Sequence, residues 1–177
     1  MMKKVAVIGT GIMAAGIAAG FIAQSTPVVI LGRSKEKADA CLDKALLLAN
    51  KIGLVGPNAQ KDASTLKAEQ LTSVLEDWSH WDQCSWVIET VAENLVLKQQ
   101  VFQYLDGVVP PQIPIGSNSS GFPISKIAEG LKTADRMMGA HYFMPAEVVP
   151  LVEIVMGQKT ALSFAQQACE LYKSINK

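Results

Sequence analysis

The stretch that decides the fold is Val5-Ala6-Val7-Ile8-Gly9-Thr10-Gly11-Ile12-Met13-Ala14, near the N-terminus. Its first four residues have the apolar, β-branched pattern of a strand, and Gly9-Thr10-Gly11 then interrupt that pattern. A helix rich in small residues is predicted from Ile12 to Gln24, and a second strand-like run at 27–31 follows it directly. A strand, a glycine turn, a helix and another strand in this order predict a βαβ unit.

The small residues of this turn are those that a bound pyrophosphate requires. Gly9 permits a tight turn, Gly11 has no Cβ to keep the pyrophosphate from the backbone, and Ala14 allows the helix to pack closely on the strand. The free N–H groups and the positive dipole end of the helix, at Ile12 and Met13, would bind the phosphates. The turn therefore predicts a dinucleotide site, and the alternative is a helix whose small residues serve only tight packing.

The same N-terminal run has a competing interpretation. Lys3 and Lys4 followed by a largely apolar stretch to Ala23 resemble a secretory signal or a short membrane span. Gly16 and Gly20 even have the spacing used for pairing membrane helices. The glycine break and the strand that follows favour the βαβ unit, so we expect no membrane partner.

Strands and helices continue to alternate along the chain. Further strands are predicted at 71–74, 86–91, 113–117, 137–143 and 151–156. Helices are predicted at 35–51, 94–106, 124–131 and 161–175, with another helical segment in the polar stretch that ends near Gln70. Pro114 indicates an edge-like or terminal position in its strand. The alternation predicts an α/β fold with a doubly wound, mostly parallel Rossmann sheet, and one dinucleotide-binding domain over residues 1–177.

Composition narrows the class of protein. A chain of 177 residues fits one domain with a core but not a second large one. With 16 Lys and Arg against 16 Asp and Glu, the chain lacks the basic patch of a nucleic-acid binder. Cys41, Cys84 and Cys169 lie far apart without a CxxC pair, so we expect three buried thiols, a reducing, cytoplasmic location and no metal site.

The second strand ends without the acidic residue expected of an NAD site. Such sites usually place Asp or Glu about 20 residues after the glycines, to bind the ribose 2′-hydroxyl. Here the sequence reads Leu31-Gly32-Arg33-Ser34. Without a carboxylate nothing repels a 2′-phosphate, Arg33 could pair with it through two hydrogen bonds, and Ser34 could add another. These residues favour NADP over NAD, and the alternative is an ordinary turn with a solvated arginine.

Three segments in the second half of the chain carry a resemblance to a known family. They read VIETVAENLVLK at 87–98, SNSS at 117–120, and HYFMP at 141–145 leading to LVEIV at 151–155. With the opening glycine turn, the chain from about Lys4 onward resembles the N-terminal domain of the L-3-hydroxyacyl-CoA dehydrogenase family. The resemblance implies an NAD(P)-dependent oxidoreductase that interconverts a 3-hydroxyacyl-CoA and a 3-oxoacyl-CoA by hydride transfer.

The resemblance also implies roles for individual residues. His141 would be the base that takes the proton of the 3-hydroxyl group, Glu153 its carboxylate partner, and Ser120 a substrate contact. Glu93, Lys98 and Ser120 would line the cofactor, with Asn118 beside them. The chemistry agrees, because histidine titrates near neutral pH and a carboxylate on its other ring nitrogen fixes the tautomer.

Each of these residues also has a plainer interpretation. His141 between apolar and aromatic residues could be a core histidine, as we interpret His80 beside Trp78 and Trp81. Ser119 and Ser120 could cap a helix, Glu93 could be a first-turn acid favoured by the helix dipole, and Lys98 could be a solvated lysine. Glu153 is harder to explain in this way, because a carboxylate in an apolar strand needs a partner.

Three departures from the family pattern affect the expected function. The acid after the second strand is absent, and Met144 stands where the family usually has Asn. Family members also continue through another strand into a helical C-terminal domain, which closes the substrate cleft and supplies most of a homodimer interface. This chain lacks that domain, so we expect it to bind cofactor and to turn over slowly.

Two alternatives to the main function stay open. The first is a dehydrogenase of a 3-hydroxy acid that carries no CoA. Lys61 and Lys67 in the polar segment 58–69 bear on this choice, because basic residues there could meet the phosphates of CoA. The second is a cofactor-binding module or fragment without turnover.

Overall fold

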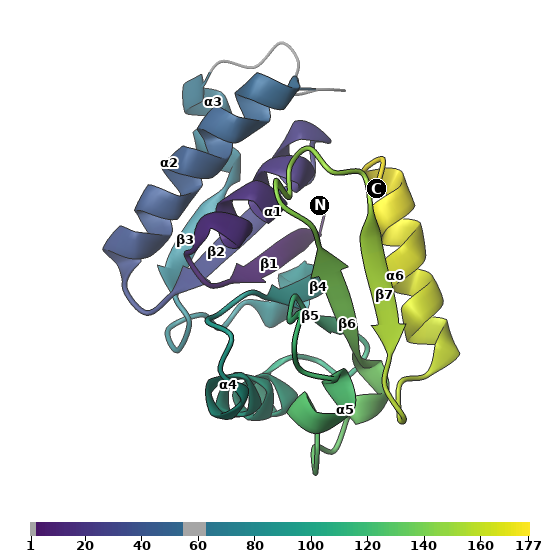
Figure 1. Cartoon of the computed structure of the whole chain (residues 1–177). Helices are drawn as coiled ribbons and strands as arrows, with labels where there is room; N and C mark the ends of the chain where they lie inside the picture. The colour runs from purple at the N-terminus through teal and green to yellow at the C-terminus, as the bar shows by residue number, and fades with distance from the viewer. Residues whose placement is uncertain (1–2, 55–62) are drawn as a thin grey trace.

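A seven-stranded sheet forms the centre of the fold, in the order β3-β2-β1-β4-β5-β6-β7 (Figure 1). The computed structural model describes residues 3–54 and 63–177, without the side chains of 63–65. The strands are β1 (Lys4–Ile8), β2 (Val28–Gly32), β3 (Leu71–Val74), β4 (Cys84–Glu89), β5 (Ile115–Ser117), β6 (Met137–Tyr142) and β7 (Val152–Met156). Strands β1 to β6 are parallel and β7 pairs with β6 in the antiparallel sense, which confirms the mostly parallel α/β sheet.

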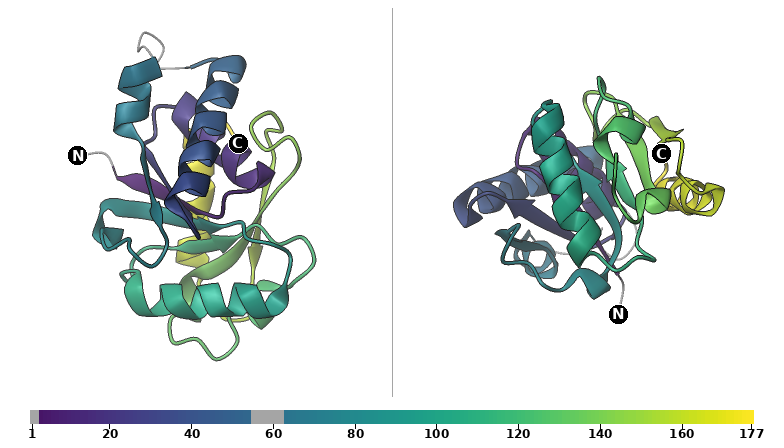
Figure 2. Two further views of the ribbon diagram at one scale, coloured as in Figure 1. Left: turned by 90° about the vertical axis from the view of Figure 1, so that its left-hand side faces the viewer. Right: turned by 90° about the horizontal axis from the view of Figure 1, so that it is seen from below.

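Helices cover both faces of this sheet (Figure 2). One face carries α1 (Ile12–Ala23), α2 (Lys35–Ile52) and α6 (Leu162–Ser174), and the other carries α4 (Leu95–Val108) and α5 (Ile124–Ile127). The remaining elements are α3 (Ala63–Glu69) and the short 3-10 helices η2 (Trp81–Gln83) and η3 (Ala134–Arg136). The sheet separates two apolar clusters, because successive side chains of a strand point to opposite faces.

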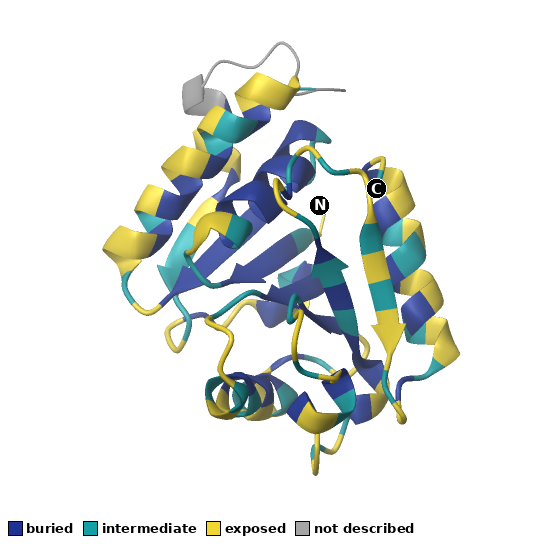
Figure 3. Ribbon diagram, viewed as in Figure 1, coloured by how far each residue is buried: buried dark blue, intermediate teal, exposed yellow. Residues whose placement is uncertain are grey.

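Helix α1 is apolar on all sides, as is typical of a helix that is buried almost entirely. Every residue from Ala14 to Ala23 is buried, as Figure 3 shows by colour. A Cβ on Gly16 would lie 3.1 Å from Ala146 Cβ, so this glycine lets the loop after β6 approach the helix. The apolar run at the N-terminus is thus divided between β1 and α1 rather than forming one long segment. In the described part of the chain, no helix has both the length and the apolar character needed to cross a bilayer.

The predicted element bounds differ from the structure in a few places. Helix α5 ends at Ile127 rather than at residue 131, because the chain turns there and Gly130 adopts a positive φ of 76°. Pro114 precedes β5, and that strand lies between β4 and β6, so the proline marks a strand terminus and not a sheet edge.

The expectation of three buried thiols was wrong for one of them. Cys41 and Cys84 are buried, and burial raises the pKa of each thiol to about 11. Cys169 is only half-buried, since it lies on α6 beside the buried stripe of that amphipathic helix.

Gly9 is the position in the glycine turn that tolerates no side chain. Its φ is +118°, and a Cβ would lie 2.8 Å from the Thr90 carbonyl oxygen. The backbone of Thr90 is itself fixed, because its N–H donates to the Ile8 carbonyl at 2.8 Å. We expect Gly9→Ala to lower the free energy of unfolding, measured in urea, by about 1–3 kcal/mol.

Gly11→Ala is the matched control for this prediction. A Cβ there would have no atom within 4 Å, and the φ of Gly11 is −80°, which any residue adopts. We expect this variant to unfold within about 0.5 kcal/mol of the unmodified chain. Equal stabilities for the two variants would contradict the steric argument.

Candidate active site

A cleft of about 960 Å³ runs along the carboxyl ends of β1 to β5. The glycine turn at 9–13 lies at its centre, and the ends of β2 and β3 contribute Gly32, Arg33 and Glu76 on one side. On the other side the cleft is lined by Thr90, Val91, Ala92, Glu93, Leu97, Val101, Asn118, Ser120 and Gly121. Ligands of open α/β sheets bind at this edge, where the strands end.

The centre of the cleft fits a pyrophosphate. The space above Gly11 is open, since no atom lies within 4 Å of the position that a Cβ would take. No side chain caps the N-terminus of α1, and its first turn holds no acidic residue. The N–H groups of that turn and the positive end of the helix dipole therefore face an open space suited to an anion.

His141 and Glu153 are direct partners across two strands. They are paired residues in the register of β6 and β7, and His141 Nδ1 lies 2.9 Å from Glu153 Oε2. His141 Nε2 lies 2.9 Å from Ser120 Oγ. A carboxylate only accepts hydrogen bonds, so in the neutral imidazole the contact with Glu153 assigns the proton to Nδ1 and leaves a lone pair on Nε2 to accept from Ser120. The arrangement gives a base whose acceptor nitrogen faces Ser120.

Both side chains of this pair are accessible to solvent, which excludes the alternative of a core histidine. The His141 side chain is 22% exposed and packs against the Phe143 ring, so it is not a core histidine. Glu153 is 51% exposed, because β7 is an edge strand. Glu153 does have the expected partner, His141, but the carboxylate is not buried, so burial does not explain the pairing.

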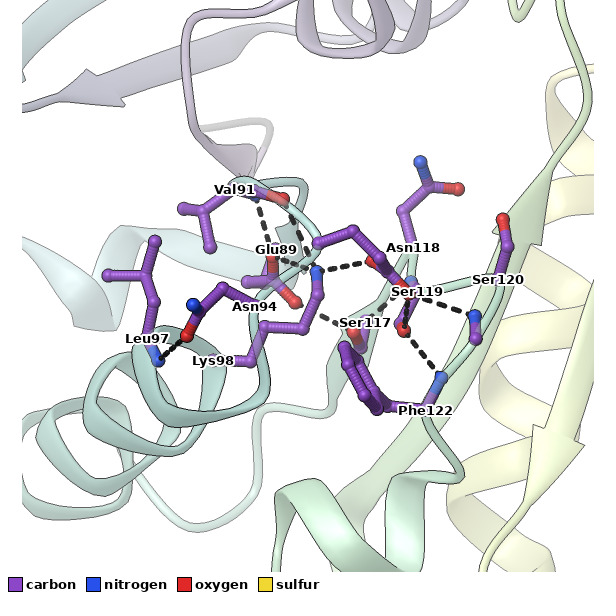
Figure 4. Close-up of polar contacts among 12 residues, drawn as sticks. Glu89, Val91, Asn94, Leu97, Lys98, Ser117, Asn118, Ser119, Ser120 and Phe122 are labelled. Carbon is purple, nitrogen blue, oxygen red and sulfur yellow. Dashed lines mark hydrogen bonds and ion pairs between the residues drawn. The ribbon is translucent and has the colours of Figure 1, made fainter.

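Beside this pair lies a buried cluster of charged and polar side chains (Figure 4). Glu89, at the end of β4, is fully buried and accepts hydrogen bonds from Lys98 Nζ at 2.8 Å and Ser117 Oγ at 2.7 Å. The Val91 N–H donates to the same carboxylate at 2.6 Å. Lys98 is likewise buried, so both charged groups have lost their hydration. Their mutual attraction and their hydrogen bonds offset that loss.

The cluster continues to the loop that carries Ser120. Lys98 Nζ lies 3.4 Å from Glu93 Oε2, and Glu93 accepts from Ser119 Oγ at 2.5 Å and from the Gly121 N–H at 2.8 Å. Partial burial raises the pKa of Glu93, but these two hydrogen bonds and the charge of Lys98 outweigh it and lower the pKa. Glu93 is therefore an anion at neutral pH, and it holds both neighbours of Ser120.

Glu89 is the residue of this site that the sequence analysis missed. Its signal was present, because it is a carboxylate in the apolar strand 84–89, as Glu153 is in its own strand. The sequence also left Lys98 as either a cofactor contact or a solvated lysine. It is neither solvated nor part of the cleft wall, since its ammonium group lies beneath Glu93 against Glu89.

The other predicted site residues are divided between the cleft and its surroundings. Gly9, Gly11, Ile12, Met13, Gly32, Arg33, Glu93, Asn118 and Ser120 line the cleft. The Tyr142 N–H donates to Asn118 Oδ1 at 2.8 Å and so joins the ends of β5 and β6. Ser34 lies outside the cleft wall and caps α2 by accepting from the Lys37 N–H.

Four further residues that the sequence analysis named belong to neither group. Lys67 forms an ion pair with Asp43 of α2 at 2.5 Å, and Lys61 lies outside the described residues. Met144 follows β6 and is 65% exposed. His80 is exposed, so it is not a core histidine, although its ring does pack against that of Trp78 in a T-shaped arrangement with centroids 5.4 Å apart.

Comparison with known proteins identifies the family. Residues 4–177 match the family model for the NAD-binding domain of 3-hydroxyacyl-CoA dehydrogenase. The chain belongs to this family. It is 34% identical to the 3-hydroxybutyryl-CoA dehydrogenase of Clostridioides difficile, over 98% of this chain and 61% of the relative. It is 35% identical to the peroxisomal fatty acid beta-oxidation multifunctional protein MFP2 of Arabidopsis thaliana, over 99% of this chain and 24% of the relative.

Solved structures of 3-hydroxybutyryl-CoA dehydrogenases superpose well on this member of the family. The Escherichia coli K12 structure gives a TM-score of 0.85 at 31% identity, covering 100% of this chain and 37% of that one. The Ralstonia eutropha PaaH1 structure gives 0.86 at 26% identity, covering 100% and 62%. The family membership and the Rossmann fold predicted from the sequence are confirmed, and the chain spans between about a quarter and three-fifths of these relatives.

Family membership leaves two finer expectations as predictions. The family model describes an NAD-binding domain, which establishes a nicotinamide cofactor but does not test the preference for NADP. The relatives include a peroxisomal plant protein as well as bacterial ones, so a cytoplasmic location stays a prediction.

Proposed function

We propose that this dehydrogenase-family chain binds NADP(H) and carries the proton-transfer residues for interconversion of a 3-hydroxyacyl-CoA and its 3-oxo form. The observation that carries the proposal is the hydrogen-bonded series Ser120–His141–Glu153 beside a cleft suited to a dinucleotide. The series provides a base with a defined tautomer, and the cleft provides a place for the hydride acceptor within the same edge of the sheet.

The residues of the series have separate tasks in this proposal. His141 Nε2 accepts the proton of the substrate's 3-hydroxyl group as its C–O single bond becomes a carbonyl. A nicotinamide held near Glu93, Asn118 and Ser120 would supply the acceptor for the hydride that leaves the same carbon. Glu153 holds the imidazole in its tautomer and stabilises the imidazolium that forms. Ser120 Oγ, already within hydrogen-bond distance of Nε2, contacts the same substrate oxygen and orients it.

The residues that would hold the cofactor are distributed along the cleft. Gly9, Gly11, Ile12 and Met13 would bind the pyrophosphate, with the adenosine toward Gly32 and Arg33 and the nicotinamide toward Glu93, Asn118 and Ser120. Lys98 would act from beneath, by holding Glu93 in place. Since β2 ends without an acid and Arg33 lines the cleft, a ribose 2′-phosphate would meet a cation there.

One observation favours NAD as a second candidate cofactor. Glu76, which follows β3, lines the same end of the cleft as Arg33. Its carboxylate could accept a hydrogen bond from a ribose hydroxyl, which is what the missing acid of β2 would do. The choice between the cofactors therefore depends on whether Arg33 or Glu76 dominates at the ribose.

Titration and turnover test this proposal together. We expect NADPH to bind at least about tenfold more tightly than NADH, and acetoacetyl-CoA to be reduced slowly. Tighter binding of NADH would assign the ribose to Glu76 and refute the NADP preference. Reduction of free acetoacetate but not of the thioester would favour a substrate without CoA, and binding without any reduction would favour a cofactor-binding module. Failure to bind either cofactor would overturn the proposal.

A further inference from the structure

The last residue of β2, Gly32, lies against the glycine turn. A Cβ added to Gly32 would lie 2.7 Å from Thr10 Cγ2, closer than real Cβ atoms come to their neighbours. The next atoms are more distant, with Ser34 O at 3.3 Å and Ala38 Cβ at 3.6 Å. The φ of Gly32 is not in the left-handed region, so its backbone would accept any residue. Space, and the Thr10 methyl group above all, is what excludes a side chain there.

Neither backbone is free to move away from this contact. The Gly9 N–H donates to the Leu31 carbonyl at 2.9 Å, which ties the glycine turn to the end of β2. The Leu75 N–H donates to the Gly32 carbonyl at 2.9 Å, which ties the same end to the turn after β3. A side chain at position 32 must therefore be accommodated by residue 10 itself.

The position that this contact controls lies in the cleft wall. Thr10, Gly32 and Arg33 all line the cleft, at its ribose end in the proposed orientation. The end of β2 is also where NAD sites place their ribose-binding acid. The absence of an acidic residue at position 32 is therefore linked to Thr10, because the Thr10 methyl group occupies the space that a side chain at position 32 would need.

We infer that Thr10 and Gly32 are a coupled pair that determines cofactor specificity: the Thr10 methyl group keeps an acidic side chain out of position 32, and Arg33 is left to face a 2′-phosphate. This inference rests on the proposed function for its ligand, a 2′-phosphorylated adenine dinucleotide. Its steric part concerns the cofactor-free chain alone.

Two substitutions at position 10 separate the methyl group from the hydroxyl. Thr10→Ser removes Cγ2 and keeps the hydroxyl, whereas Thr10→Val keeps a methyl group in its place and removes the hydroxyl. Gly32→Ala introduces the Cβ. Comparing its effect across backgrounds cancels the change in strand propensity that Gly→Ala brings in each of them.

The first measurement is thermal unfolding of the cofactor-free chain. We expect Gly32→Ala to lower Tm by about 3–6 °C in the unmodified and Thr10→Val backgrounds, and by less than about 1 °C in the Thr10→Ser background. An equal loss in the Thr10→Ser background would overturn the steric pairing. This result does not depend on whether the chain binds a dinucleotide.

The second measurement is the equilibrium dissociation constants of NADPH and NADH for Gly32→Asp in the same three backgrounds. We expect weaker NADPH binding throughout, and NADH binding at least about tenfold tighter in the Thr10→Ser background than in the other two. Equal NADH affinities in the three backgrounds would overturn the role of Thr10 in specificity. An unmodified chain that binds neither cofactor would instead refute the proposed function, while the unfolding measurement would still decide the steric pairing.

Discussion

Replacing Lys98 with methionine is expected to lower the free energy of unfolding by about 3–5 kcal/mol, because it leaves a buried carboxylate without its counter-ion. The Lys98 and Glu89 side chains are 1% and 0% exposed, so solvent cannot replace the lost ammonium group. Ser117 and the Val91 N–H would still donate to Glu89, but neither carries a charge. Urea unfolding followed by circular dichroism measures the change.

Two further variants sharpen this prediction. Lys126→Met removes an exposed lysine from α5, and we expect it to change the free energy of unfolding by less than about 0.5 kcal/mol. Adding Glu89→Gln to Lys98→Met removes the unpaired charge while keeping an amide that can accept from the Val91 N–H. The double variant should therefore be more stable than Lys98→Met alone. A Lys98→Met chain as stable as the Lys126→Met chain would show that the buried pair does not hold the fold.

Replacing His141 with asparagine is expected to slow the reduction of acetoacetyl-CoA by about 10²–10⁴-fold, the usual range for loss of a general acid or base. Asparagine keeps a hydrogen-bonding side chain in β6 but cannot exchange a proton near neutral pH. His141 does not line the cleft, so the dissociation constant of NADPH should change by less than about threefold. The rate is followed by consumption of NADPH, and the binding by titration.

His80→Asn is the matched control for the histidine variant. The chain has two histidines, and His80 is exposed beside Trp78, outside the cleft wall. We expect His80→Asn to leave both the rate and the affinity unchanged. Glu153→Gln should also slow the reaction while retaining cofactor binding, because the amide can no longer stabilise the imidazolium. A His141→Asn chain that keeps most of its rate would show that the proton travels by another group.

The order of strands and helices could be predicted from the sequence because its signals are local. The Gly9-Thr10-Gly11 break separates β1 from α1 whatever the rest of the chain does, and apolar runs of β-branched residues mark β2 and β4 in the same way. The end of α5 could not be predicted as securely. Its apolar pattern continues to Leu131, but the chain leaves the helix after Ile127 toward η3.

The residues of the candidate site that belong to sequence motifs could be predicted, whereas the burial of its charged side chains could not. The sequence placed His141 and Glu153 on neighbouring strands, and the β6–β7 register pairs them directly. The state of Lys98 was left open, because a lysine on an amphipathic helix gives no sign of the carboxylate beneath it. Ser34 caps α2 in the folded chain by accepting a hydrogen bond, which the sequence analysis did not predict, and its expected donation to a phosphate stays a prediction.

The chain's local pattern by itself determined the βαβ opening and the site of the glycine turn, because each depends on neighbours a few positions away. The proposed roles of His141, Glu153 and Ser120 came from the family resemblance instead. Only the tertiary structure decided that Glu89 and Lys98 are buried as a pair and that the Thr10 methyl group fills the space beside Gly32. Both outcomes join residues more than eight positions apart. Such contacts depend on which backbone segments the sheet brings together, and no local pattern encodes that distance.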